Sequence, residues 1–133
     1  MEGFMRYTAR LMVATLFSLA ACGGGMTSPG GGGGGGGAVG QVVVGNIFFR
    51  SAHNGSQNAA VDTIPAGSTV TWAWNAAGSH SIQSTGQEPG IFRNSVVMSG
   101  ANDTYSVTFQ HPGTYPYQCA VHGAAMTGVI VVQ

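Results

Sequence analysis

Short runs of β-branched and aromatic residues, separated by glycine, proline, asparagine and serine, constrain the fold of this chain more than any other feature. These runs begin at Val39. In one of them Val70, Trp72 and Trp74 alternate with smaller or polar residues, so their side chains fall on one face of a strand. The segment Thr104 to Phe109 alternates in the same way. The pattern predicts an all-β domain in which each strand buries one face.

Several short strands with turn residues between them favour a two-sheet β-sandwich. A domain of this size buries enough apolar surface to fold alone. We expect strands at Gln41 to Val44, Ile47 to Arg50, Ser68 to Trp74, Ser79 to Gln83, Thr104 to Phe109, Thr114 to Gln118 and Thr127 to Val132. We expect loops at Ala52 to Ala60, Ala76 to Gly78 and Thr85 to Gly90.

Charged residues are scarce, and this excludes some classes of function. The chain has no lysine, and its four arginines balance four acidic residues. It therefore cannot neutralise a row of phosphates, and we expect no nucleic-acid partner. The sequence also lacks a Ser-His-Asp set, a carboxylate pair and a phosphate-binding loop, so we do not expect an enzyme.

The first 21 residues have the organisation of a signal peptide. Arg6 and Arg10 precede an apolar run from Leu11 to Ala21, which is too short to span a bilayer comfortably. The run ends in Leu19-Ala20-Ala21-Cys22, which resembles the lipobox of bacterial lipoproteins. This resemblance implies that Cys22 is acylated and becomes the first residue of the mature protein. The alternative is an ordinary secretory signal that is cleaved after a small residue.

Residues 22–38 are expected to form a flexible tether. They include eight consecutive glycines, Gly30 to Gly37, and glycine loses too much backbone entropy to hold a regular structure here. With Cys22 as a lipid anchor, the tether would hold the domain in the bacterial cell envelope, on the periplasmic side. Gly23 after the anchor resembles the signal for outer-membrane retention. The alternative for the glycine run is a neutral low-complexity expansion.

A Cys-x2-His-x3-Met run near the C-terminus carries the chemistry. It places the thiol of Cys119, the imidazole of His122 and the thioether of Met126 within eight residues. Two histidines and a cysteine in a plane, with a weak axial methionine, hold copper in electron-transfer sites. The alternative use of Cys119, a disulfide with Cys22, must be considered in an exported protein. Copper explains the neighbouring histidine and methionine better.

A second histidine is needed to complete such a site. His111 precedes a Pro-Gly turn and is expected to be solvated, and His53 lies in a polar loop where a second metal contact stays open. His80 follows a tryptophan-bearing strand and a short glycine turn. A side chain there can point into one end of a sandwich, so His80 is the candidate.

The segment Gly113 to His122, followed by Met126 and the run Thr-Gly-Val-Ile-Val-Val, resembles the C-terminal signature of the plastocyanin/azurin family of cupredoxins. The strand Trp72-Ala73-Trp74 leading to His80 resembles the other ligand region of that family. The resemblance covers residues 39–133, which would form the cupredoxin domain. It implies an eight-stranded Greek-key sandwich, one-electron transfer, and a copper ion bound by His80, Cys119, His122 and Met126.

One spacing and two residues depart from the family pattern. Three positions separate His122 from Met126 where plastocyanins commonly have four, Val121 replaces a frequent proline, and Ser81 replaces an asparagine. We expect a monomer whose redox partners dock on the uncharged surface around His122. Two other functions stay open: a copper-delivery protein with the same ligands, and a metal-free β-sandwich that serves as a binding module.

Overall fold

The computed structural model describes residues 37–133, and these residues form eight β-strands without an α-helix. The predicted signal peptide, Cys22 and all but the last two residues of the predicted tether lie outside this range. Within it, no helical segment has the length and hydropathy needed to cross a bilayer.

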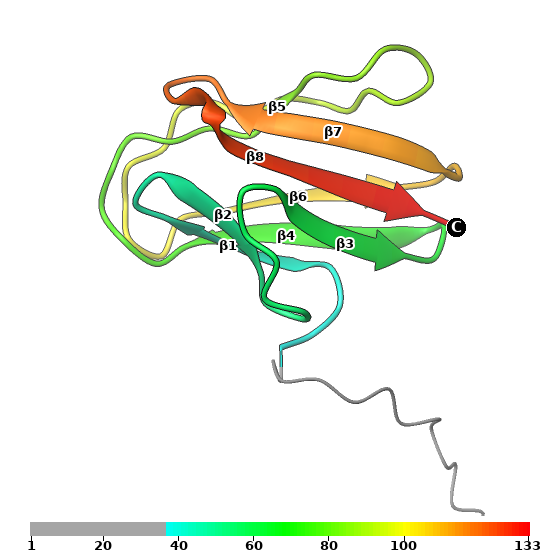
Figure 1. Cartoon of the computed structure of the whole chain (residues 1–133), viewed down its shortest axis with the longest axis horizontal. Coiled ribbons are helices and arrows are strands. Elements are labelled where there is room, and N and C mark those ends of the chain that lie inside the picture. The colour runs from blue at the N-terminus through cyan, green and yellow to red at the C-terminus, as the bar shows by residue number, and fades with distance from the viewer. Residues whose placement is uncertain (1–36) are drawn as a thin grey trace, which may run out of the picture. The chain divides into compact units, whose positions relative to one another are not determined.

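The strands form two four-stranded sheets packed face to face (Figure 1). The strand order is β2-β1-β4-β6 in one sheet and β3-β8-β7-β5 in the other. Their bounds are β1 Gln41–Gly45, β2 Phe48–Ser51, β3 Ala60–Ile64, β4 Ser68–Trp74, β5 Gln83–Ser84, β6 Thr104–Phe109, β7 Gly113–Cys119 and β8 Gly123–Val132. This arrangement confirms the predicted all-β sandwich with eight strands.

The core between the sheets is built on aromatic rings. Val70, Trp72 and Trp74 of β4 are all buried, as the alternation predicts. The Trp72 ring meets the ring of Tyr117 from β7 edge-on, with centroids 5.3 Å apart. Phe92, from the connection between β5 and β6, stacks on Trp72 with centroids 5.8 Å apart and also lies edge-on to Tyr117 at 6.4 Å. The long connection is thereby fixed to the core rather than left to solvent.

Three of the sequence-based expectations about strands are wrong in part. β3 is not among the expected strands, because Ala60, Asp62 and Ile64 alternate with Val61 and Thr63 and a buried aspartate hides the apolar pattern. The expected strand Ser79 to Gln83 is reduced to β5. The strand expected at Thr127 to Val132 is longer than predicted, because β8 begins at Gly123, directly after His122.

The sheet directions place the candidate ligands at one end of the sandwich. β7 runs toward that end and stops at Cys119, and β8 starts back from it at Gly123. β4 is antiparallel to β6, which is joined to β7 at the opposite end, so β4 also ends near the ligands, at Trp74. His80 lies in the connection that follows Trp74, between β4 and β5. In Figure 1 this end lies on the left.

Candidate metal centre

Three metal-binding side chains converge at this end of the domain. The donor atoms of His80, Cys119 and His122 all lie within 4.8 Å of one another. The Cys119 Sγ atom is 3.4 Å from His122 Nδ1 and 3.9 Å from His80 Nδ1. The two imidazole rings have centroids 4.9 Å apart. The structure therefore brings together three of the four residues that the sequence proposes as ligands.

Cys119 owes its position to strand alternation. It is the last residue of β7, where Tyr115, Tyr117 and Cys119 point inward in turn, and its side chain is fully buried. The strand expected at Thr114 to Gln118 thus extends one residue further, to Cys119. A strand end holds the thiol more rigidly than a loop would, because its backbone is fixed by pairing with β8.

Met126 is the fourth proposed ligand, and it also points into the domain. It is fully buried in β8, on the face that carries Ile130 and Val132. The register between β7 and β8 shifts after Gln118, which pairs with Thr127, to Cys119, which pairs with Gly123. The shift leaves Ala124, Ala125 and Met126 of β8 without a paired residue on β7.

His80 is held by its backbone rather than by a regular strand. Its N–H donates to the carbonyl of Met98 at 2.9 Å, and the Met98 N–H donates to the carbonyl of His80 at 2.8 Å. The next residue, Ser81, is buried, and its Oγ accepts a hydrogen bond from the N–H of Ala120 at 3.1 Å. Ser81 therefore links the segment that carries His80 to the residue that follows Cys119.

Burial of His80 favours its neutral form. Its side chain is 1% exposed. Loss of solvation lowers the pKa of His80 from its ordinary value, and the nearby His122 lowers this pKa further by charge repulsion. Metals bind the neutral imidazole, so burial favours the form of His80 that a metal ion would need.

The donor distances fit one small metal ion. Bond lengths of about 2.0 Å to an imidazole nitrogen and about 2.3 Å to a thiolate, as in protein zinc sites, place N and S about 3.7 Å apart when the bonds are about 120° apart. The two distances from Cys119 Sγ, 3.4 and 3.9 Å, lie on either side of this value. Two imidazoles, a thiolate and a thioether form the donor set that selects copper over harder cations.

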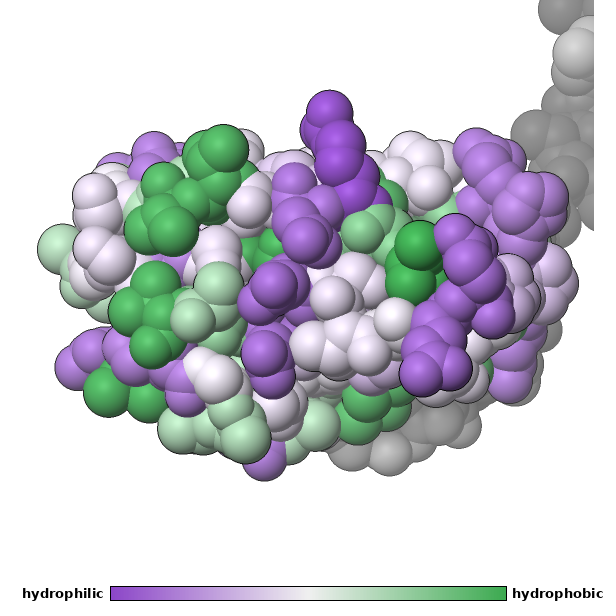
Figure 2. Space-filling view, turned by 90° about the horizontal axis from the view of Figure 1, so that it is seen from above, coloured by the Kyte–Doolittle hydropathy of each residue, from purple (hydrophilic) through white to green (hydrophobic). Residues whose placement is uncertain are grey.

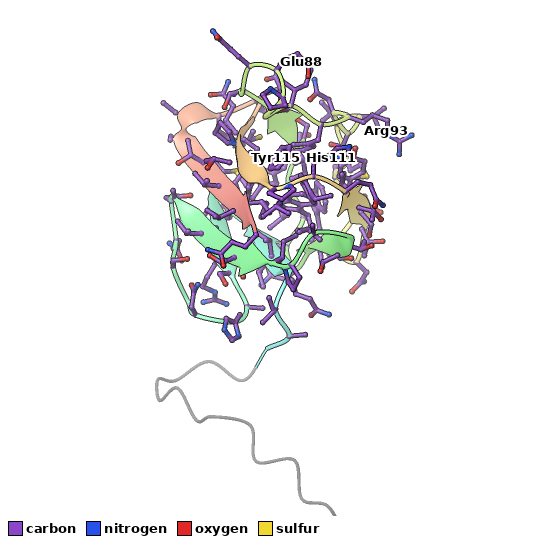
Figure 3. All side chains as sticks on the ribbon, turned by 90° about the vertical axis from the view of Figure 1, so that its right-hand side faces the viewer. Glu88, Arg93, His111 and Tyr115 are labelled. Atoms are coloured by element: carbon purple, nitrogen blue, oxygen red, sulfur yellow. The ribbon has the colours of Figure 1, made fainter. Side chains whose placement is uncertain are left out.

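The other two histidines lie outside this cluster. His53 and His111 are both exposed, in agreement with the solvated positions expected for them. His111 belongs to the turn between β6 and β7, and its carbonyl accepts a hydrogen bond from the Tyr115 hydroxyl at 2.8 Å. Figure 3 looks at the end of the domain on which His111 lies, next to Tyr115. Cys119 is a free thiol within residues 37–133, and Cys22 lies outside them.

One structural partner of the site, Met98, was missed by the sequence analysis. Its carbonyl and N–H fix the His80 backbone, but it belongs to an isolated bridge and not to a strand. A local sequence pattern cannot predict the pairing of His80 with Met98. The pairing depends on the path of the long connection between β5 and β6. In the sequence, Met98 is marked only as an apolar residue that follows Val96 and Val97.

Sequence comparison relates this chain to a family of copper-binding proteins. Residues 57–133 match the family model of copper binding proteins, plastocyanin/azurin family. Plastocyanin of Scenedesmus fuscus is 40% identical over 86 residues, which cover 53% of this chain and 80% of that protein. Amicyanin-alpha of Methylorubrum extorquens is 41% identical over 71 residues, covering 53% of this chain and 58% of that protein.

Solved structures agree with the sequence comparison. A purple cupredoxin from Nitrosopumilus maritimus superposes with a TM-score of 0.54 at 26% identity, over 70% of this chain and 98% of that one. An oxidised single-site variant of amicyanin gives 0.57 at 28% identity, over 73% of this chain and 83% of that one. The donor cluster and the matched family both support one copper ion as the cofactor. This chain belongs to the plastocyanin/azurin family of copper-binding proteins, the cupredoxins.

Proposed function

We propose that this protein is a type 1 copper protein that carries single electrons between redox partners of the bacterial cell envelope. One observation carries the proposal: a buried thiol and two imidazole nitrogens, from His80, Cys119 and His122, meet within 4.8 Å at the end of a rigid sandwich. One-electron transfer is also the function implied by the resemblance to plastocyanin and azurin.

In this proposal His80, Cys119 and His122 would hold the copper ion, with Met126 as a fourth, weaker ligand. A bound copper ion supplies a Cu(I)/Cu(II) couple of one electron. Cys119 and Met126 lie on strands β7 and β8, and hydrogen bonds to Met98 hold the His80 backbone. Donors held in this way would move little between the two oxidation states of a bound ion, so little reorganisation would oppose the transfer of an electron.

The proposal is tested by adding Cu(II) to the purified protein and recording its visible spectrum and reduction potential. We expect an intense thiolate-to-copper absorption band and a reversible one-electron couple in the native protein. Cys119→Ser should abolish the band. If the native protein gives no such band, the type 1 site is refuted. If Cu(I) passes readily to a chelator of moderate affinity, copper delivery replaces electron transfer as the function.

We further propose that electrons leave through the His122 ring, on a surface where partners dock by apolar contact. His122 is partly exposed, unlike His80, and its neighbours in the chain Val121, Ala124 and Ala125 are exposed. Figure 2 shows groups of exposed hydrophobic residues toward the left, where Figure 1 places the connection between β7 and β8. Apart from His122 itself, no residue between Cys119 and Met126 has an ionisable side chain.

Electron self-exchange between two copies of the protein tests this surface without knowledge of the partner. Ala124→Asp places a carboxylate on each copy, and the two charges repel when the surfaces meet. We expect at least a tenfold slower exchange at low salt, partly restored at high salt, with the copper band unchanged. Ala124→Ser is the uncharged control. Equal exchange rates in all three proteins would contradict transfer through His122.

The envelope location rests on residues outside the described range. We propose that residues 1–21 are removed, that Cys22 is acylated, and that residues 22–38 tether a monomeric domain, residues 39–133, to a membrane, with the outer membrane as the expected site. Labelling with a radioactive fatty acid in a bacterial host should mark the native protein and not Cys22→Ala. Equal labelling of both, or none of either, would contradict the lipid anchor.

A further inference from the structure

The outer edge of the His80 ring packs against a glycine. A Cβ atom added at Gly78 would lie 2.8 Å from His80 Nε2 and 3.5 Å from His80 Cδ2. Real Cβ atoms essentially never approach another heavy atom this closely. The ring therefore occupies space that only a residue without a side chain leaves free.

The backbone of Gly78 imposes the same requirement independently. Its φ angle is +152°, in a region that residues with a side chain rarely adopt. Two separate constraints, one conformational and one steric, thus apply to the same position. The steric constraint concerns a side chain that the fold has buried almost completely, since His80 is 1% exposed.

Contacts on several sides restrict the movement of the His80 ring away from position 78. Two reciprocal hydrogen bonds to Met98 fix its backbone, and the hydrogen bond from Ala120 to Ser81 fixes the next residue. His122 lies on another side, with its ring centroid 4.9 Å away. A push from position 78 must therefore appear as a rotation or displacement of the ring itself.

The two nitrogens of the ring have different environments. Nδ1 faces the Cys119 thiol at 3.9 Å, whereas Nε2 is buried without a hydrogen-bond partner among the described residues. No hydrogen bond from the described residues to Nε2 therefore orients the ring. Contact with the Gly78 backbone takes over the role that a hydrogen bond to the far nitrogen plays in many metal sites.

We infer that Gly78 is a positioning residue for the metal centre. By lacking a side chain, it lets the His80 ring lie with Nε2 against the backbone and Nδ1 directed at the metal position. This inference rests on the proposed role of His80 as a copper ligand. It assigns the orientation of that ligand to a residue that touches neither copper nor any electron-transfer partner.

The test compares Gly78→Ala with Gly67→Ala. Gly67 precedes β4, has a φ of +84°, and has no atom within 4 Å of an added Cβ, so its substitution brings backbone strain without the clash. Copper affinity is measured by competition with a chelator, the Cu(II) geometry by electron paramagnetic resonance, and metal-free stability by thermal unfolding. We expect Gly78→Ala to weaken copper binding at least tenfold and to change the resonance spectrum. Gly67→Ala should lower the unfolding temperature and leave both copper measurements unchanged.

Native copper affinity and spectrum in a folded Gly78→Ala would overturn the inference while leaving the proposed function intact. Absence of the thiolate-to-copper band in the native protein would instead overturn both. If Gly78→Ala does not fold, the native Cu(I) protein provides the test by NMR. We expect the His80 proton on Nε2 and a nuclear Overhauser contact between that proton and the Gly78 Hα atoms. A proton on Nδ1, or no such contact, would overturn the inference.

Discussion

Ser81→Ala tests whether the two ligand-bearing segments are coupled through a single hydrogen bond. The hydroxyl of Ser81 is the acceptor for the Ala120 N–H at 3.1 Å, and Ser81 is 3% exposed. Removal of the hydroxyl leaves that N–H without its partner. Because Ala120 is itself exposed, water reaches part of the group, and the cost falls near the net value of one hydrogen bond, about 1 kcal/mol.

A loss of about 1 kcal/mol lowers the unfolding temperature of a domain of this size by about 4–8 °C. We expect this decrease in the metal-free protein, measured by thermal unfolding. In the copper-loaded protein the freed backbone after Cys119 should also shift the thiolate-to-copper band and the reduction potential. The coupling therefore predicts two linked changes, one in stability and one in the electronic structure of the site.

Ser95→Ala is the control. The Ser95 Oγ accepts from the Ile82 N–H at 2.8 Å and donates to the Val96 carbonyl at 2.8 Å, so its loss removes hydrogen bonds from the neighbouring part of the same segment. These bonds do not reach the residues around Cys119. We expect a loss of stability at least as large as that of Ser81→Ala and an unchanged copper band. The reasoning is refuted if Ser81→Ala leaves the band unchanged, or if Ser95→Ala shifts it by the same amount.

Two other predictions concern buried side chains. Met126→Leu nearly conserves volume in a fully buried position, so it should lower the free energy of unfolding by less than about 1.5 kcal/mol. The variant should retain copper and have a changed reduction potential. Complete loss of copper would show that Met126 is not a weak ligand. Asp62 is buried with Oδ1 hydrogen-bonded to Ser51 and Oδ2 without a partner among the described residues, and burial raises its pKa against the opposing effects of Ser51 and His53. The folded protein thus holds this proton more tightly than the unfolded chain, so the contribution of Asp62 to stability is present below the unfolded pKa, about 3.9, and is lost as the pH rises through the folded pKa. Asp62→Asn should therefore be more stable than the native protein at pH 8 by about 1–3 kcal/mol, with a smaller difference at pH 4, in urea unfolding; parallel pH profiles would contradict this.

The strands that carry a regular alternation were predictable from the sequence. β4 and β6 have the bounds that their alternating residues predict, because every second side chain is buried in β4 and is half-buried or buried in β6. β3 was not predictable in this way. Its central inward position is Asp62, and only the folded core shows that Ser51 compensates part of the cost of burying that carboxyl group.

The chemical identity of the site was likewise in the sequence. The spacing of Cys119, His122 and Met126 follows from a strand end, a tight turn and a returning strand, which are all local. The spacing could not show that Met126 lies inside β8, because the β-bulge after Gln118 depends on how two strands pair.

What the sequence by itself determined is the donor set, since ligand chemistry depends on residue type and the local spacing keeps three donors together. What only the tertiary structure decided is how the fourth donor, His80, is brought to them and turned. That depends on the pairing with Met98, the bond from Ala120 to Ser81 and the free space at Gly78, which join segments distant in the chain. Contacts of this kind follow from packing in three dimensions, and a one-dimensional pattern does not encode them separately.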